Sequence, residues 1–288
     1  MTAYRPLIVS VQDNRISLRA RLTTWWVILR IAMEERFVYR GDFALGTLMR
    51  FLPIITQIFL WTAIFQASGR TEIAGYTRNT VIAYYMLTMI SRAFSSMPGL
   101  CGGIALQVRN GEIKKFLIQP VDMLGFLLLG RVAHKAAYYT IAVVPFAFVF
   151  FLCRGFFPGW PEAPVFIAFC LSLFMGFLLG FFIEASLGLV AFWFLEVSSL
   201  VFIYNLLSFF LSGHMFPLDL LPVWAHDIVS VLPFQYLAYT PAAIFLGKIQ
   251  GPELWTSLAI EACWLLVFVV LARIMFQRGI HRYSGFGG

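Results

Sequence analysis

Apolar segments separated by short polar stretches dominate the chain, and six of them approach the length of a membrane-crossing helix. Such a helix needs about 20 apolar residues to cross the hydrocarbon core of a bilayer. Pro53 interrupts the first segment, Arg92 and Pro98 the second, and Pro145 the third, while the boundary between the fourth and fifth is the least distinct. The six predicted spans are residues 43–65, 80–104, 132–152, 164–190, 197–216 and 254–276. The pattern therefore predicts an all-α membrane protein with six transmembrane helices.

The composition supports this interpretation. Of the 288 residues, 60% are hydrophobic and only 12% are charged, and the mean hydropathy is +0.83. Soluble domains carry about 25% charged residues, so a soluble fold of this length would lack the polar surface to cover itself. We therefore expect one membrane domain, residues 43–276, between an N-terminal segment, residues 1–42, and a tail, residues 277–288.

Lysine and arginine gather on one side of the predicted spans. Of the 21, sixteen lie before the first span and at its start, between the second and third, or at the end of the sixth; four lie on the other side, and Arg92 lies inside a span. Because such an excess marks the cytoplasmic side, we expect both termini to be cytoplasmic. Topology and attraction to anionic lipid headgroups explain the net charge of +7, so no nucleic-acid partner is expected.

Residues 17–40 have the pattern of an amphipathic helix. Apolar side chains recur at helical spacing, with arginines between them, at Leu22, Trp25, Trp26, Leu29, Met33 and Phe37. A helix of this composition next to a span is typical of one that lies in the membrane interface. An ordinary cytosolic helix is the alternative.

A second special segment, residues 107–122, reads QVRNGEIKKFLIQPVD. Asn110 could cap a short helix, whose apolar face would be Ile113, Phe116 and Leu117. Its polar residues are Glu112, Lys114 and Lys115. A short helix that has one apolar and one polar face and lies between two spans is suited to docking a partner. The alternative is a loop that only sets the topology.

A third segment, residues 213–252, is apolar but rich in proline. It holds five of the 13 prolines of the chain, at positions 217, 222, 233, 241 and 252. Proline breaks helices, so this segment cannot cross the membrane as one helix. It predicts short re-entrant helices on the outer side, between the fifth and sixth spans.

The charged residues Arg92, Glu184 and Glu261 lie inside predicted spans. Arg92 is costly in mid-membrane unless it is paired or faces water, and Glu184 or Glu261 could pair with it. Glu184 belongs to a stripe of mostly small residues that would let helix backbones approach closely: Ala168, Ser172, Gly176, Gly180, Glu184 and Gly188. The alternatives are a solvated Glu184 near the headgroups and an Arg92 ion pair that only holds the helices together.

The fifth predicted span carries a polar face. Its members are Ser198, Asn205, Ser208 and Ser212. Such a face either lines a polar pathway or bonds to neighbouring helices.

Several motifs are missing from the sequence. It contains no G-x-x-x-x-G-K-[ST] loop for ATP, no H-E-x-x-H and no G-x-S-x-G, and its four histidines and four cysteines are scattered. We therefore predict no catalytic residue, no metal site and no cofactor on this chain.

Two stretches carry a resemblance to a known family. They are GEIKKFLIQPVD, residues 111–122, and LSGHMFPLDLLPVW, residues 211–224, the latter followed by LPF at 232–234 and PAAIFLG at 241–247. With the order of the predicted elements, they make the chain resemble the permease subunits of ABC-2 type exporters, and in particular a poorly characterised bacterial branch of them. The resemblance covers nearly the whole chain and does not fix the substrate.

The resemblance implies a transport subunit of the bacterial inner membrane and not an enzyme. It implies a homodimer or a pair with a sister permease, and a separate cytoplasmic P-loop ATPase that binds ATP and Mg²⁺. ATPase closure would push on a coupling helix that comprises Arg109, Glu112, Ile113, Lys114, Lys115, Phe116 and Leu117. Spans two and five would line the pathway, and Gly213, Pro217, Pro222 and Pro233 would belong to an outer gate.

Other classes of function remain open at this point. A secondary transporter or channel would work without ATP or a partner. An intramembrane enzyme acting on lipid would use Glu184, Glu261 or His214 as acid or base. A scaffold subunit would tolerate loss of Arg92 and Asn205.

Overall fold

The computed structural model describes residues 18–37, 40–119, 121–194 and 196–283, so the outer parts of both predicted terminal segments lie outside the described residues. Helices dominate this part of the chain, and one two-stranded hairpin is present. In chain order the elements are α1 (Leu18–Phe37), α2 (Arg40–Ser68), β1 (Glu72–Ile73), β2 (Tyr76–Thr77), α3 (Arg78–Ser95), α4 (Leu100–Arg109), α5 (Lys114–Ile118), α6 (Met123–Leu152), η1 (Arg154–Phe156), α7 (Ala163–Leu189), η2 (Val190–Phe192), α8 (Ser198–Leu211), η3 (Leu218–Leu220), α9 (Val223–Val231), η4 (Pro233–Leu237), α10 (Tyr239–Phe245) and α11 (Gly251–Arg282).

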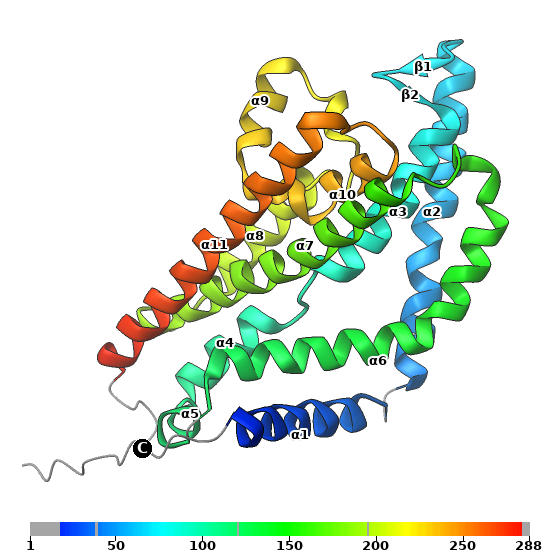
Figure 1. Ribbon diagram of the computed structural model, residues 1–288. Helices are drawn as coiled ribbons and strands as arrows, with labels where there is room; N and C mark the ends of the chain where they lie inside the picture. The colour runs from blue at the N-terminus through cyan, green and yellow to red at the C-terminus, as the bar shows by residue number, and fades with distance from the viewer. Residues whose placement is uncertain (1–17, 38–39, 120, 195, 284–288) are drawn as a thin grey trace, which may run out of the picture.

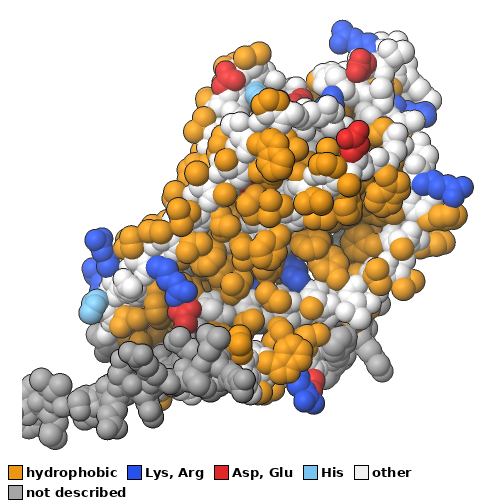
Figure 2. Space-filling view, viewed as in Figure 1, with side chains coloured by type: hydrophobic (Ala, Val, Ile, Leu, Met, Phe, Trp, Pro, Cys, Tyr) orange, Lys and Arg blue, Asp and Glu red, His pale blue; other side chains and the backbone are white. Residues whose placement is uncertain are grey.

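The helices form an elongated body with two distinct ends (Figure 1). The hairpin β1–β2 and α9 lie at one end, which we call the hairpin end. Helices α1 and α5 lie at the opposite end, which we call the α5 end. Figure 2 shows a mostly apolar surface between them, with lysine and arginine concentrated toward the ends and some basic atoms recessed at mid-height. This distribution is that of a protein surrounded by lipid.

Among the described residues, four helices are long and apolar enough to cross a membrane. These segments are Phe51–Ser68, Met123–Leu152, Ala163–Phe192 and Gly251–Arg282. They correspond to the predicted first, third, fourth and sixth spans. The fifth predicted span, 197–216, is shorter than expected: α8 has 14 residues and so extends about 21 Å.

The second predicted span, 80–104, is not one helix. It divides into α3 and α4, because the chain leaves the helical conformation from Ser96 to Gly99. Pro98 disfavours a helical residue before it, and Gly99 adopts a φ of +74°, which glycine reaches without strain. Pro98 thus ends the helix, whereas the sequence interpretation had it only weaken one.

The predicted N-terminal helix is confirmed as α1. It lies beside the first half of α6 at the α5 end (Figure 1). A Cβ on Gly125 would come 3.0 Å from Cη2 of Trp25, so glycine allows the close contact. α6 then bends upward; Pro145 lies inside it and cannot bond to the carbonyl of residue 141, which accounts for a kink.

The proline-rich segment forms short helices, as predicted. Pro217 precedes η3, Pro222 caps α9, and Pro233 begins η4. Each proline stands where a helix starts, a position that needs no backbone N–H. α10 packs against α3 and α7, so this segment covers the body of the protein at the hairpin end.

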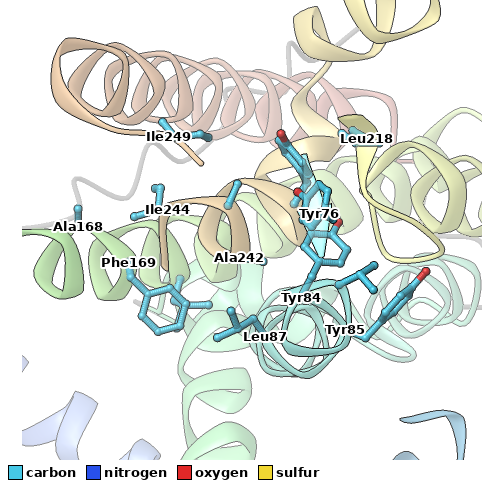
Figure 3. Close-up of a cluster of buried hydrophobic side chains, with 14 of the residues drawn as sticks. Tyr76, Tyr84, Tyr85, Leu87, Ala168, Phe169, Leu218, Ala242, Ile244 and Ile249 are labelled. Carbon is cyan, nitrogen blue, oxygen red and sulfur yellow. The ribbon is translucent and has the colours of Figure 1, made fainter. Parts of the chain in front are cut away.

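Two large hydrophobic clusters hold the body together. The cluster nearer the hairpin end is built from α3, α7 and α10 around Tyr84, Phe169 and Ile244 (Figure 3). The cluster nearer the α5 end joins α4, α7 and η2 around Ile104, Phe181 and Phe192. α7 contributes to both clusters. In its apolar stretch 67% of the residues are buried, against 17–22% in the other three long helices, so α7 is the central helix.

Candidate functional site

Charged side chains surround the break between α3 and α4. Lys135 on α6 donates to the carbonyl oxygens of Ala93 and, at 2.7 Å, Ser96. Arg131, one turn earlier on α6, donates to the carbonyl of Pro98 at 2.9 Å. The backbone N–H of Met97 donates to Oε1 of Glu184 on α7 at 3.2 Å. Backbone groups without helical partners must be satisfied inside a membrane, and these three side chains satisfy them.

This corrects the placement of two basic residues. Arg131 and Lys135 were counted with the loop between the second and third spans, but both lie well inside α6, which begins at Met123. Asp122 caps this helix by accepting from the N–H of Gly125 at 2.7 Å, and Arg273 of α11 bonds to the same carboxylate. Arg131 and Lys135 are four residues apart, which puts them on one helix face. This spacing was the available signal in the sequence that both belong to a helix.

The small-residue stripe on α7 packs against the same break. The main chain of Ser95 lies directly over Gly180. A Cβ on Gly188 would come 2.9 Å from the carbonyl oxygen of Cys101 on α4, and one on Gly176 would come equally close to that of Tyr236. The predicted close helix contacts are therefore present, and Glu184 lies among them.

The structure separates the two predicted partners of Arg92. Glu261 is fully buried in α11 and its Oε2 accepts from Ser172 Oγ at 2.8 Å. Glu184, by contrast, accepts from the Met97 N–H at the break, whose carbonyls Arg131 and Lys135 also contact. Arg92 itself donates to Ser208 Oγ of α8 at 3.1 Å, a contact that joins the predicted second and fifth spans.

The polar face predicted for the fifth span does not share one environment. Ser208 and Ser212 are buried, but Asn205 is exposed on α8 among exposed apolar side chains. Ser198 lies at the start of the helix, where its N–H donates to the Glu196 carboxylate at 2.9 Å, and bonds to Ser198 lower the pKa of Glu196. The face therefore divides into an internal part, an exposed part and a helix start.

A cavity of about 530 Å³ lies beside Arg92, between α2, α3 and the segment that follows α8. Sequence reasoning did not find it, because Gln57 and His214, which line it, come from distant parts of the chain. Its wall also includes the following residues: Pro53, Ile54, Tyr85, Thr88, Met89, Arg92, Ser96, Phe209 and Met215. The cavity thus joins the predicted first, second and fifth spans and reaches the break at Ser96.

A short helix, α5, lies where the coupling helix is predicted, but its faces differ from the prediction. Ile113 and Phe116 are buried, with Phe116 5.4 Å from the ring of Phe126 on α6. Both belong to the chain's own core and cannot dock a partner. The exposed apolar residues are Leu117 at 44% and Ile118 at 82%, and Ile118 was missed.

The charged residues of this region also form specific contacts. Glu112 pairs with Lys115 at 3.7 Å, and Arg109 with Glu196 at 3.8 Å. Asn110 does not cap α5: it ends α4, with its N–H donating to the carbonyl of Leu106 at 2.9 Å. The reason is that α4 continues to Arg109, so position 110 belongs to the end of that helix.

A hydrogen-bond network centred on Asp219 lies in the segment predicted to contain the outer gate. The hydroxyl of Tyr76 donates to Oδ2 at 2.6 Å and that of Tyr239 to Oδ1 at 2.8 Å. Burial, followed by the charge of Asp219, raises the pKa of Tyr76 far above its usual value. Tyr84 donates to the carbonyl of Gly213 at 2.5 Å. Asp219 was missed, because a single acidic residue among prolines gives no pattern.

Gly213 itself is required for this packing. Its φ is +78°, and a Cβ would come 2.7 Å from both the Tyr84 hydroxyl and Tyr239 Cβ. Any larger residue would therefore push α10 away from α3.

A body of long apolar helices is that of a multi-pass membrane protein. The model of a family described as ABC-2 family transporter protein matches residues 51–287, and the chain belongs to this family. It is therefore a membrane transport subunit, a permease. A search of curated proteins found no match.

Proposed function

We propose that this chain is the permease subunit of an ATP-driven exporter, working with a separate cytoplasmic ATPase that binds ATP and Mg²⁺ and with a second permease. The observation that carries the proposal is α5, a short helix at one end of the body that presents Leu117 and Ile118 to solvent. Membership of the ABC-2 family supports a partner of this kind. Exposed apolar side chains beside Lys114 and Lys115 suit a partner groove with an acidic rim.

The proposed topology has six spans in the inner membrane with both termini in the cytoplasm. α3 with α4 would form the second span and α8 the fifth, while η3 to α10 would enter the outer leaflet and return. The α5 end would be cytoplasmic. α1 would lie in the interface there, since Leu22, Trp26 and Ile31 stay more than half exposed after α1 packs on α6.

The contacts at the break support a route from α5 to the pathway. α5 leads into α6, and α6 holds the carbonyls of the break through Arg131 and Lys135. Movement of α6 would therefore change the angle between α3 and α4 and the shape of the cavity at Ser96. ATP binding would drive this change only if the closed ATPase prefers one of the two permease conformations.

Opening at the hairpin end would require the Asp219 network to separate. Tyr84 and Tyr85 bind the carbonyls of Gly213 and Met215, so α3 holds the gate directly. A shift of α3 at the break would be felt at the gate through the same helix.

The test is co-purification of the permease in mild detergent, followed by mass spectrometry. Wild type should bring down a P-loop ATPase. Ile118→Glu should reduce its amount by about tenfold, because a charge replaces an exposed apolar anchor. Trp160→Glu, an exposed aromatic at the hairpin end (84% exposed), is the matched control and should keep the ATPase. A chain that purifies without an ATPase would favour a secondary transporter instead.

A further inference from the structure

The cavity beside Arg92 is lined by apolar and polar side chains together. The apolar ones are Pro53, Ile54, Met89, Phe209 and Met215. The polar ones are Gln57, Tyr85, Thr88, Arg92, Ser96 and His214. Its volume of about 530 Å³ lies within the range of about 300–1,000 Å³ that small-molecule sites occupy. The volume and the mixed lining therefore suit a ligand that has both a polar group and an apolar part.

Two polar atoms on this wall have no hydrogen-bond partner among the residues that the structure describes. Gln57 Oε1 and His214 Nδ1 are buried and make no hydrogen bond. Buried polar atoms are nearly always bonded, so a ligand or water must complete both. Either group can donate: the amide by turning over so that its nitrogen occupies the place of the oxygen, and the imidazole through the tautomer with a proton on Nδ1.

The charge of the wall selects the sign of the ligand. Arg92 is the cationic residue of the lining, and none of the described residues that line the cavity is acidic. A guanidinium binds carboxylate and phosphate oxygens in a planar, two-bond geometry. An anionic group would therefore be held from three elements at once, by Arg92 on α3, Gln57 on α2 and His214 after α8.

We propose that this cavity binds an amphipathic anion, a carboxylate or phosphate group attached to an apolar chain. The headgroup binds Arg92, His214 and the Gln57 amide, and the apolar chain lies on Met89, Phe209 and Met215. As the assignment of a cargo class this rests on the proposed transport function; as the assignment of a binding site it does not. A free fatty acid and an anionic phospholipid share this headgroup chemistry.

The experiment uses the full chain in nanodiscs of phosphatidylcholine and measures saturable binding of radiolabelled dodecanoate. Dodecyl phosphate should compete, whereas dodecanol and dodecylamine, which have the same chain length without the negative charge, should not. Arg92→Gln should weaken binding by at least about tenfold. His214→Ala should weaken it severalfold and serves as the second variant if Arg92→Gln fails to fold. Arg154→Gln, a cation at the hairpin end over the ring of Phe151, should bind as wild type.

A second arm separates the two sources of the ligand. Displacement of dodecanoate when the nanodiscs contain phosphatidylglycerol would identify the site as one for membrane lipid, and no displacement would identify it as one for free amphiphiles. Equal competition by dodecanol, absence of saturable binding, or unchanged binding in both Arg92→Gln and His214→Ala would overturn the proposal. None of these outcomes depends on co-purification of an ATPase, so the site and the proposed function can fail separately.

Discussion

The polar groups at the two ends of α3 are hydrogen-bonded by side chains of opposite kinds. At the hairpin end, tyrosine hydroxyls on ring-packed side chains bind Asp219 and the carbonyls of Gly213 and Met215. At the break, the flexible side chains of Arg131, Lys135 and Glu184 bind bare backbone atoms. A rigid aromatic ring fixes one arrangement, while a long charged side chain can follow a moving carbonyl. We infer from this comparison that the hairpin end acts as an anchor and the break as a hinge.

The contact beneath the hinge gives the largest expected effect. Gly180→Leu should lower stability by about 4 kcal/mol or more, because the main chain of Ser95 occupies the space of any side chain there. The yield of monodisperse protein in size-exclusion chromatography measures it. Gly102→Leu is the control, since nothing lies within 4 Å of its Cβ position, and it should behave as wild type. A normal yield of Gly180→Leu would mean that α7 does not pack closely on the break.

The anchor gives the next largest effect. Asp219→Ala should lower the free energy of unfolding by about 3 kcal/mol, because the hydroxyls of Tyr76 and Tyr239 lose their acceptor. Thermal unfolding measures the loss, and hydrogen exchange should accelerate in residues 213–219 but not in 95–101. Asp227→Ala, whose side chain is 73% exposed, should change stability by no more than about 0.5 kcal/mol. Equal acceleration in both segments would remove the distinction between anchor and hinge.

The hinge itself gives the smallest of these changes. Lys135→Met should cost about 1–3 kcal/mol, since the carbonyls of Ala93 and Ser96 lose a charged donor. Hydrogen exchange should accelerate at residues 95–101 and stay unchanged at 213–219, the reverse of Asp219→Ala. The exposed Lys114→Met on α5 is the matched control. Unchanged hydrogen exchange at residues 95–101 in Lys135→Met would show that Arg131 and Glu184 hold the break without Lys135.

Much of the fold was predictable because hydrophobic periodicity records which faces avoid water. The stripe around Gly180 and the short helices after Gly213 follow from residue type and proline spacing alone. The division of the second span was only partly predictable: Pro98 signalled an interruption, but the cations that compensate it come from α6. Judged by the hydropathy of the neighbouring sequence, Arg131 and Lys135 look like basic residues of a loop. Their backbone carbonyl partners come from α3 and the break, which only the packed structure brings close to them.

The candidate sites were harder to predict, for the same physical reason. α5 has five residues, so periodicity cannot decide which side faces the core, and Ile113 and Phe116 turned inward while Ile118 stayed exposed. The cavity collects Gln57, Arg92 and His214 from three elements that are distant in sequence. The aromatic partners of Asp219 are likewise 143 and 20 residues away, beyond the reach of any local pattern.

The short length of α8 has a consequence for the lipid around the protein. The helix extends about 21 Å, while the hydrocarbon core of a bilayer is about 30 Å thick, and Phe202 and Ile203 face outward from it, more than half exposed. In the proposed topology, where α8 is the fifth span, lipids that touch this surface would have to tilt or compress to match it, at a cost of a fraction of a kcal/mol for each ångström of mismatch. A second subunit that covered α8 would relieve that deformation, so elastic strain in the bilayer would itself draw two permeases together along this helix.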